Sequence, residues 1–356
     1  GNHELSTRCC TSELKPPCIM NETKPVRTIV DLAELAGVSA GTVSRALANS
    51  PLISTKTRAR IQQLAKDHAF RPNVMAQNFR SRRTGAIGVL IPLGHEVDQS
   101  ISDPFFITML GYLADELSAR GYDLLLSRII PQGPDWLDIA IGSGRTDGVI
   151  LIGQSTQAEV IDRVAKCYTP MVVWGARLPG QVHCSVGSDN RKGGALATRH
   201  LIERGCRRIA FFGDPLAPEI AERYEGARMA MREAGLADDL ELLPVHLMAD
   251  VAHDAILSWL RDRPHAPDGI VAASDVIAMS ALRACAELGY SVPEQMKIVG
   301  YDNLSFAAHT NPPLTSISQD VSHGARHLVD LLFRRMDGEC TPSVVLEPQL
   351  VVRQSS

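Results

Sequence analysis

Short apolar runs alternate with amphipathic segments along most of this chain, and this alternation constrains the fold more than any other feature. The first set begins with AIGVLIP at residue 86 and continues through FFITMLGYLADELSARG, YDLLLS, DGVILIG and MVVW. The apolar runs have the length of buried strands, and the segments between them have helical spacing. Alternation of this kind predicts an α/β fold with parallel sheets and right-handed crossovers.

A second set of the same kind follows the first. It begins with ATRHLIERG and continues through RRIAFFGD, LLPVHL, GIVAAS, IAMSALRACAELG and KIVGYD. At 356 residues the chain is too long for one ordinary domain, and two such sets are compatible with two α/β lobes.

Charge is distributed unevenly along the chain. Residues 24–85 hold eleven lysines and arginines against three acidic residues, a net charge of +8, so the remainder carries −12 of the overall −4. A basic N-terminal module on an acidic body is typical of a nucleic-acid-binding protein. The alternative is a basic face that is merely solvated.

Other classes of protein are not expected. The chain has no run of about 18 apolar residues that predicts a transmembrane helix, and its first 24 residues lack the apolar core of a signal peptide. We therefore expect a cytoplasmic protein without a membrane partner. Eight scattered cysteines with no C-x-x-C pair predict free thiols rather than disulfides, and no metal or other cofactor is expected.

The stretch DLAELAGVSAGTVSRAL contains GVSAG, which matches the G-x-S-x-G pattern around the nucleophilic serine of many hydrolases. That pattern needs a strand before the serine, whereas here the preceding apolar residues recur at helical spacing after Thr28, a good N-cap. Gly37 supplies a left-handed helix end, and Ser39 is placed to cap a second helix. The sequence predicts a helix-turn-helix, with Ser39 as a cap and no enzymatic activity.

A third helix is predicted after Ser54, with apolar residues from Ile61 to Phe70 closing a small core over the first two helices. Arg71 and Pro72 then break the chain. Residues 73–80 have the length of one or two helical turns, which are marginal in isolation, so we expect a hinge helix that forms only on DNA binding.

Several motifs carry a family resemblance. These are TIVDLAELAGVSAGTVSRAL, ISTKTRARI, RPNVMAQNFR, IGVLIP, HLIERGCRRIAFFGD, VAASDVIAMSAL, GYSVPEQMKIVGYDN and PPLTSISQD. From residue 26 to its end the chain resembles the LacI/GalR family of bacterial transcriptional regulators. MNETKPVRTIVDLAELAG would be a normal start for this family, so residues 1–24 are expected to be a disordered tail or non-native extension.

The resemblance implies a small all-α DNA-binding domain followed by a two-lobed sensor of the periplasmic-binding-protein type. The expected segments are a helix-turn-helix domain at 25–72, a hinge helix and linker at 73–84, lobe 1 at 85–187 and 316–342, lobe 2 at 188–315, and C-terminal strands at 343–356. The chain is expected to cross between the lobes near residues 187–190, 302–306 and 313–317.

The resemblance also implies which residues contact DNA. Base contacts are expected from Ala40, Gly41 and Arg45, and Arg45 is the strongest candidate because arginine pairs bidentately with guanine. Phosphate contacts are expected from Thr28, Ser39, Thr42 and Ser44. In the hinge, Asn73, Gln77, Phe79 and Arg80 are candidates, with Phe79 as an apolar wedge in the minor groove.

Effector binding is expected in the cleft between the lobes, beyond the carboxyl ends of the strands. The candidates are Phe106, Trp174, Arg223, Ser274, Asp275 and Asp302. By resemblance, Asp302 accepts ligand hydroxyls, Arg223 contacts the effector from lobe 2, and Phe106 stacks on it. Structural alternatives remain: bracing of the cleft for Asp275, helix caps for the two aspartates, a surface ion pair with Glu219 for Arg223, and core packing for the aromatic residues.

The predicted function is repression of carbohydrate-utilisation genes by a homodimer or tetramer that binds a palindromic operator in double-stranded DNA and is released by a sugar. A purine or nucleoside is the alternative effector. A stand-alone sugar-binding protein would share the two lobes but would not carry residues 26–84. The mechanism is a population shift, and we expect induction rather than corepression.

Overall fold

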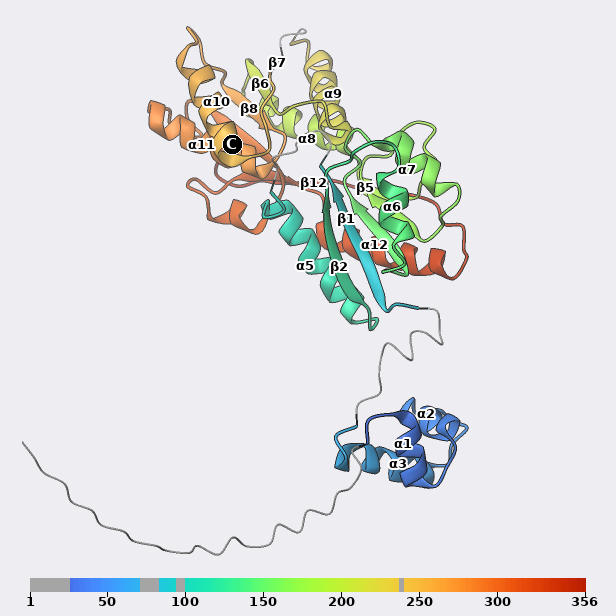
Figure 1. Ribbon diagram of the computed structural model, residues 1–356. Helices are drawn as coiled ribbons and strands as arrows, with labels where there is room; N and C mark the ends of the chain where they lie inside the picture. Colours follow the sequence, from blue (N-terminus) through green and yellow to red (C-terminus); the bar gives the residue numbers. More distant parts are fainter. Residues whose placement is uncertain (1–25, 71–82, 94–99, 237–239) are drawn as a thin grey trace, which may run out of the picture. The chain divides into compact units, whose positions relative to one another are not determined.

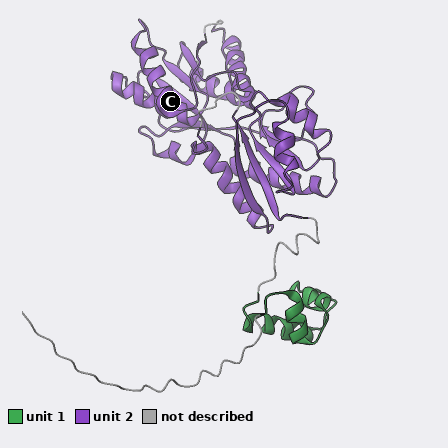
Figure 2. Cartoon of the chain, in the orientation of Figure 1, with its two compact units in different colours: residues 1–81 green, residues 82–356 purple. Residues whose placement is uncertain are grey.

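The computed structural model describes residues 26–70, 83–93, 100–236 and 240–356. The chain divides into two compact units, residues 1–81 and 82–356 (Figure 2). The division falls inside the segment expected to form the hinge and linker. Among the described residues, no helix is both long and apolar enough to cross a membrane.

In the described part of the first unit, residues 26–70, three helices pack into one domain. Its helices are α1 (Ile29–Ala36), α2 (Ala40–Leu47) and α3 (Thr55–Asp67). Each helix begins at its predicted cap: Thr28 forms a capping box with Asp31, Ser39 accepts from the backbone of α2, and Ser54 accepts from the backbone of α3. The turn residue Gly37 has a φ of 63°, as predicted.

Apolar side chains from all three helices meet in one small core. It contains Leu32, Ala33, Ala36, Val43, Ala46, Ile61, Ala65 and Phe70. The third helix therefore closes the core as the sequence predicted, which fixes α1 and α2 in a helix-turn-helix arrangement.

Lobe 1 of the second unit is built on a six-stranded parallel sheet with the strand order β11-β5-β4-β3-β1-β2. Its strands are β1 (Ala86–Pro92), β2 (Asp123–Ile129), β3 (Gly148–Ile152), β4 (Met171–Trp174), β5 (Ser185–Ser188) and β11 (Val344–Leu346). Its helices are α5 (Pro104–Ser118), α6 (Trp136–Gly142), α7 (Ala158–Ala165) and α12 (Val321–Met336) (Figure 1).

Apolar side chains of the lobe 1 strands point alternately to the two faces of the sheet and form a separate hydrophobic core on each face. Ile150 and Ile152 of β3 pack in the cluster with α5 and α12, whereas Val149 and Leu151 pack in the cluster with α6 and α7. Because successive strand residues point to opposite faces, both faces of the sheet are covered by helices.

Lobe 2 has a second six-stranded sheet, with the order β12-β10-β9-β8-β6-β7. Its strands are β6 (Ile209–Phe212), β7 (Glu241–Leu243), β8 (Gly269–Ala272), β9 (Lys297–Asp302), β10 (Thr315–Ser318) and β12 (Gln349–Val351), of which β12 runs antiparallel to β10. Its helices are α8 (Asn190–Glu203), α9 (Pro218–Glu233), α10 (Ala249–Arg261), α11 (Asp275–Leu288) and the 3₁₀ turn η1 (Ser305–His309).

Of the three predicted lobe crossings, the one near residues 302–306 is wrong and the one near 313–317 is displaced by a few residues. The chain leaves lobe 1 after β5, near residues 188–190, as predicted. However, β9, η1 and β10 all stay in lobe 2, because β10 pairs in parallel with β9. The chain returns to lobe 1 after Ser318 and crosses again between Leu346 and Gln349, so the predicted boundary at 315/316 falls inside β10.

Candidate functional sites in the helix-turn-helix unit and the interlobe cleft

The second helix of the first unit exposes one face and buries the other. Val43 and Ala46 of α2 are buried in the small core, whereas Gly41 and Arg45 are exposed. Ala40, Thr42 and Ser44 are half-buried. The face of α2 that is free of the core therefore carries Gly41 and Arg45, two of the three residues predicted to contact bases, whereas Ala40 packs against the core.

The hydroxyl groups near the helix starts act as caps. The Oγ1 of Thr28 accepts from the backbone N–H of Asp31 at 3.1 Å, and the Oγ of Ser39 accepts from that of Thr42 at 3.2 Å. The Oγ of Ser39 also lies 2.9 Å from the hydroxyl of Thr42. Ser39 therefore caps a helix, as predicted, and has none of the strand context of a hydrolase nucleophile.

Two of the basic residues in this unit have structural partners that the sequence analysis missed. Arg58 donates to the carbonyl groups of Ser50 and Ile53, at 3.0 Å each, and Arg60 donates to the carbonyl of Ala36. These arginines stabilise turns as well as adding charge. The predicted hinge residues Asn73, Gln77, Phe79 and Arg80 lie outside the described residues.

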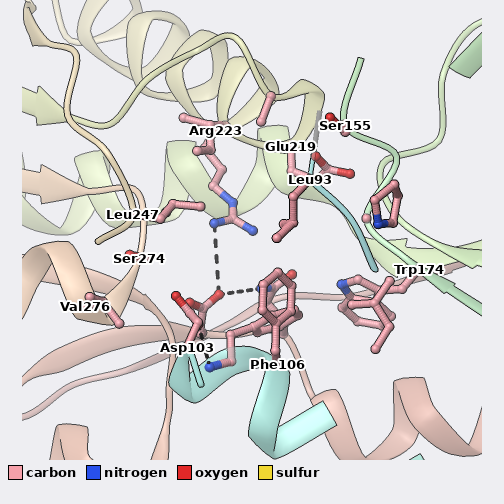
Figure 3. Close-up of a pocket in the computed structure, with 18 residues that line it drawn as sticks. Leu93, Asp103, Phe106, Ser155, Trp174, Glu219, Arg223, Leu247, Ser274 and Val276 are labelled. Atoms are coloured by element: carbon pink, nitrogen blue, oxygen red, sulfur yellow. Dashed lines mark hydrogen bonds and ion pairs between the residues drawn. The ribbon is translucent and has the colours of Figure 1, made fainter. Parts of the chain in front are cut away.

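A pocket lies in the cleft of the second unit, beyond the carboxyl ends of strands from both sheets (Figure 3). Lobe 1 and its connections supply Pro92, Leu93, Asp103, Phe105, Phe106, Ile152, Gly153, Ser155, Trp174 and Gln319, and lobe 2 supplies Ala217, Glu219, Ile220, Arg223, Leu247, Ser274, Val276 and Asp302. Five of the six predicted effector-binding residues line this pocket, and Asp275 does not.

Aromatic side chains form the lobe 1 wall of the pocket. The ring centroids of Phe105 and Trp174 are 6.2 Å apart, and those of Phe105 and Phe106 are 6.0 Å apart. Phe106 and Trp174 are also buried in the core of lobe 1, so each serves both packing and the pocket. Figure 3 shows Phe106 and Trp174 on the side of the pocket that faces Arg223.

Arg223 reaches into the pocket from α9 and is held by hydrogen bonds within lobe 2. Its Nε donates to the Oδ1 of Asn190 at 2.9 Å, and one terminal nitrogen donates to the carbonyl of Ala273 at 2.5 Å. The same nitrogen lies 4.0 Å from the Oδ1 of Asp302. Because both charged side chains are buried, Arg223 is not a surface partner of Glu219.

Close packing between α8 and α9 fixes the position of Arg223. A Cβ at Gly194 of α8 would lie 1.9 Å from the carbonyl oxygen of Arg223, and a Cβ at Gly226 of α9 would lie 1.9 Å from that of Arg191. Only glycine permits this approach of the two helix backbones.

Asp302 ends β9 in a strained conformation, with a φ of 107°. Its Oδ1 accepts a hydrogen bond from the side-chain amide of Gln319 at 2.5 Å. Burial raises the pKa of this carboxyl well above its usual range, against the opposing effect of the Arg223 guanidinium. Since η1 begins after Leu304 with no side-chain cap, Asp302 is not a helix cap.

The two residues after β8 have different roles. Ser274 caps α11 by accepting from the backbone N–H of Ile277 at 3.2 Å, and it lines the pocket. Asp275 is fully buried, and its carboxyl accepts from the backbone N–H of Leu304 at 2.7 Å and from the hydroxyl of Ser316 at 2.6 Å. The prediction that Asp275 contacts the effector is therefore corrected: it supports the loop that carries Asp302.

Glu219 is a pocket residue that the sequence analysis named only as a surface partner. Its Oε1 accepts from the backbone N–H of Ala176 at 3.1 Å, which links α9 of lobe 2 to the segment after β4 of lobe 1. Glu219 precedes Arg223 by four residues, so both lie on one face of α9, and this spacing is the signal in the sequence. Asp103, which caps α5, and Phe105 were also missed.

Charge in the pocket is mostly acidic. Among the described residues that line it, Arg223 is the only cation, whereas Asp103, Glu219 and Asp302 are acids. No group of three or more His, Cys, Asp and Glu residues in the described parts of the chain is arranged to hold a metal ion. The pocket therefore offers hydrogen-bonding groups and aromatic surface.

Comparison with known proteins agrees with this architecture. A model described as bacterial regulatory proteins of the lacI family matches residues 28–73, and one described as a periplasmic binding protein-like domain matches residues 198–356. The HTH-type transcriptional regulator CelR of Thermobifida fusca is 31% identical over 341 residues, which cover 92% of this chain and 98% of the relative.

Solved structures show the same fold. The complex of transcriptional regulator CelR with cellobiose is 30% identical, with a TM-score of 0.65, and the match covers 92% of this chain and 99% of that chain. The lac repressor dimer bound to operator and the anti-inducer ONPF has a TM-score of 0.81 at 23% identity, over 93% of this chain and 99% of that one.

These matches confirm the predicted fold class, a helical DNA-binding module followed by two α/β lobes. The lacI family model and the curated relative place the chain among transcriptional regulators rather than enzymes. The family model covers the helix-turn-helix unit, and the curated relative aligns with nearly the whole chain. The chain belongs to the LacI family of bacterial DNA-binding transcriptional regulators.

Proposed function

We propose that this regulator is a cytoplasmic repressor of carbohydrate-utilisation genes and that a neutral sugar bound between its lobes releases it from a palindromic operator. The observation that carries the proposal is the make-up of the pocket. An aromatic wall of Phe105, Phe106 and Trp174 faces the buried pair of Arg223 and Asp302 across the cleft.

A sugar fits this combination of surfaces. The C–H face of a pyranose or furanose ring packs on aromatic side chains, while adjacent hydroxyl groups pair with a carboxyl and a guanidinium group. A phosphorylated sugar fits less well, because Arg223 is the only cation among the described pocket residues, while Asp103 and Glu219 add acidic groups to the lining. The solved complex of CelR with cellobiose supports a sugar for this chain as well.

Control of DNA binding follows from a shift between two states of the cleft. In this proposal two copies of the chain bind two half-sites through α2, so the operator has approximate twofold symmetry. The sugar contacts both lobes and changes their relative position, and this change reaches the segment before residue 83. The hydrogen bond between Glu219 and the backbone of Ala176 is one interlobe contact that such a change would alter.

A thermal-shift screen tests the effector class. The purified protein is heated with a panel of neutral sugars, sugar phosphates and nucleosides, and each hit is repeated with Asp302→Ala and Arg223→Ala. Glu222→Gln is the matched control, because Glu222 lies beside Arg223 on α9 but pairs with Arg191 on the exposed surface.

We expect a neutral sugar to raise the melting temperature of the wild type and of the control, but of neither pocket variant. A nucleoside hit with the same pattern would support the alternative effector. A stabilising sugar that is insensitive to both pocket variants would show that the site lies elsewhere. Sugar binding without binding to any duplex from a random DNA library would support a stand-alone binding protein instead.

A further inference from the structure

Asp147 anchors the start of lobe 1. It stands one residue before β3, at the end of the sheet opposite the pocket. Its Oδ1 accepts from the backbone N–H of Thr84 at 2.6 Å and from the Thr84 hydroxyl at 3.0 Å, and its Oδ2 accepts from the backbone N–H of Gly85 at 3.0 Å. Hydrogen bonds to a carboxylate are roughly twice as strong as those between neutral groups.

These three bonds lie outside the β ladder. The backbone already sets the register of β1 on β3, since Ile87 pairs with Gly148 and the N–H of Asp147 donates to the carbonyl of Ala86 at 2.9 Å. The side chain of Asp147 instead holds Thr84 and Gly85, which precede β1. It therefore fixes the conformation of these two residues at the N-terminal start of lobe 1.

The backbone at this point has a sharp change of direction. Gly85 has a φ of +73°, a conformation that other L-residues rarely adopt. The neighbouring ion pair between Arg83 and Asp337 spans 3.8 Å with both side chains mostly exposed, so it contributes little. The carboxylate of Asp147 thus supplies three of the hydrogen bonds that hold this turn, beside the bond from the backbone N–H of Asp123 to the carbonyl of Gly85 at 2.9 Å.

Two adjacent strands connect this attachment with the pocket. β1 follows Thr84 and Gly85 and ends at Pro92, and β3 follows Asp147 and ends at Ile152; Pro92 and Ile152 both line the pocket. A seven-residue strand spans about 23 Å. The anchored turn and the lobe 1 side of the pocket therefore belong to one buried, hydrogen-bonded pair of strands.

We propose that Asp147 is a positioning residue for operator binding: its carboxylate holds residues 84 and 85, which lie next to the DNA-binding unit in the sequence, in one conformation at the start of lobe 1. This inference rests on the proposed function. A dimer that reads two half-sites needs a fixed separation of its DNA-binding units, whereas binding to non-specific DNA does not. Loss of the anchor therefore lowers the preference for operator over other DNA.

The test uses the full chain and two DNA probes. One probe is a duplex that the wild-type protein selects from a random library, and the other is a scrambled duplex of equal length and composition. Affinity for both is measured by fluorescence anisotropy at one salt concentration. Hydrogen exchange reports whether the amides of Thr84 and Gly85 lose protection.

The variants form matched sets. Asp147→Asn removes the charge and one acceptor, Thr84→Val removes the hydroxyl donor, and Thr84→Ser retains it. Asp123→Asn is the control for charge. Asp123 is an exposed carboxylate at the start of the neighbouring strand β2. Its backbone N–H donates to the carbonyl of Gly85, and the substitution retains this bond while removing the charge.

We expect Asp147→Asn to lower the ratio of specific to non-specific affinity by about tenfold, as expected for the loss of charge-assisted hydrogen bonds. Thr84→Val should lower it by about threefold, because it removes one of the three bonds to Asp147 together with the bond from the backbone N–H of Ala86 to the hydroxyl. Thr84→Ser and Asp123→Asn should have the same ratio of specific to non-specific affinity as the wild type. Amide exchange at residues 84 and 85 should accelerate in Asp147→Asn.

Two results would overturn the inference. One is an unchanged affinity ratio in variants whose amides at 84 and 85 exchange faster. The other is an equal loss for both duplexes together with a lower melting temperature, which would indicate a purely structural role. If Asp147→Asn does not fold, the affinity ratios of Thr84→Val and Thr84→Ser test the inference instead. Equal ratios in these two variants would overturn it. A wild-type protein that selects no duplex would instead refute the proposed function.

Discussion

The guanidinium group of Arg223 lies 3.7 Å from the ring centroid of Tyr301 and 4.0 Å from the carboxyl of Asp302, so two consecutive residues of β9 contact one arginine. Successive residues of a regular strand point to opposite faces. The φ of 107° at Asp302 breaks this alternation and allows its carboxyl to face the same side chain as Tyr301. Backbone strain at a pocket residue is typical of a functional site.

Arg223→Lys should weaken effector binding by about tenfold or more, because lysine keeps the charge but loses the planar fork and the stacking on Tyr301. Isothermal titration with the sugar identified by the thermal-shift screen measures this change. Arg191→Lys is the matched control, since Arg191 pairs with Glu222 on the exposed surface of α8 and α9. Equal loss of affinity in both variants would contradict a specific role for Arg223.

Gly324→Ala should displace Trp174, which forms part of the aromatic wall of the pocket. A Cβ at Gly324 of α12 would lie 2.3 Å from the Cζ3 of Trp174, so the indole must move into the pocket or α12 must shift. Overpacking of this kind costs about 1–3 kcal/mol of stability. We expect a lower melting temperature and weaker effector binding.

The control for this substitution is Gly142→Ala in α6, where a Cβ would meet no atom within 4 Å. That variant should be as stable as the wild type or slightly more stable, because alanine favours a helix over glycine. If Gly324→Ala retained full effector affinity and the same tryptophan emission spectrum, the packing of α12 against Trp174 would be unimportant to the pocket.

Local signals in the sequence were sufficient for much of this architecture. The caps at Thr28, Ser39 and Ser54 and the left-handed Gly37 were predicted because each depends on chemistry within a few residues. The pocket residues at strand ends were predictable because the carboxyl ends of parallel strands form the binding edge of such folds.

The remaining features depend on contacts between distant segments. TSIS at β10 has polar residues that are not typical of a buried strand, yet Thr315 and Ser316 are fully buried. The backbone N–H of Arg353 donates to the hydroxyl of Thr315, and the hydroxyl of Ser316 donates to Asp275. These long-range partners are absent from any local pattern, so the lobe boundary was misplaced.

Asp275 was misassigned for a related reason. A Cβ at Gly300 would lie 2.3 Å from its Oδ1, so the carboxyl packs directly against β9, and Asp275 does not line the pocket. Residue type and position at a strand end predict a ligand contact, but the direction of the side chain depends on the neighbouring strand.

Asp275 should make stability depend on pH. Burial raises its pKa to about 7, against the opposing hydrogen bonds from Ser316 and Leu304. A carboxyl with a raised folded-state pKa adds stability at pH values below its unfolded value near 4, and this contribution is lost as the pH rises toward about 7. Relative to Asp275→Asn, the wild type should therefore be more stable at pH 5 than at pH 8.

Urea unfolding at the two pH values measures this difference. The asparagine variant is similar in shape and can exchange hydrogen bonds with the same two partners, Leu304 and Ser316. A difference between wild type and variant that stays constant from pH 5 to pH 8 would show that Asp275 does not titrate in this range.

Arg45 and Arg58 should affect DNA binding in different ways. Arg45 is on the exposed face of α2, so Arg45→Ala should relax the preference at one base pair of each half-site, by about tenfold for a lost bidentate contact. Arg58 donates to two carbonyl groups in the turn after α2, so Arg58→Ala should lower the stability of the unit and weaken binding to all sequences alike. Selection from a random duplex library with each variant, followed by affinity measurement on single-base substitutions, separates the two effects. A uniform loss with Arg45→Ala would assign Arg45 to phosphate contact, since phosphate contacts position a protein on DNA without specifying the sequence.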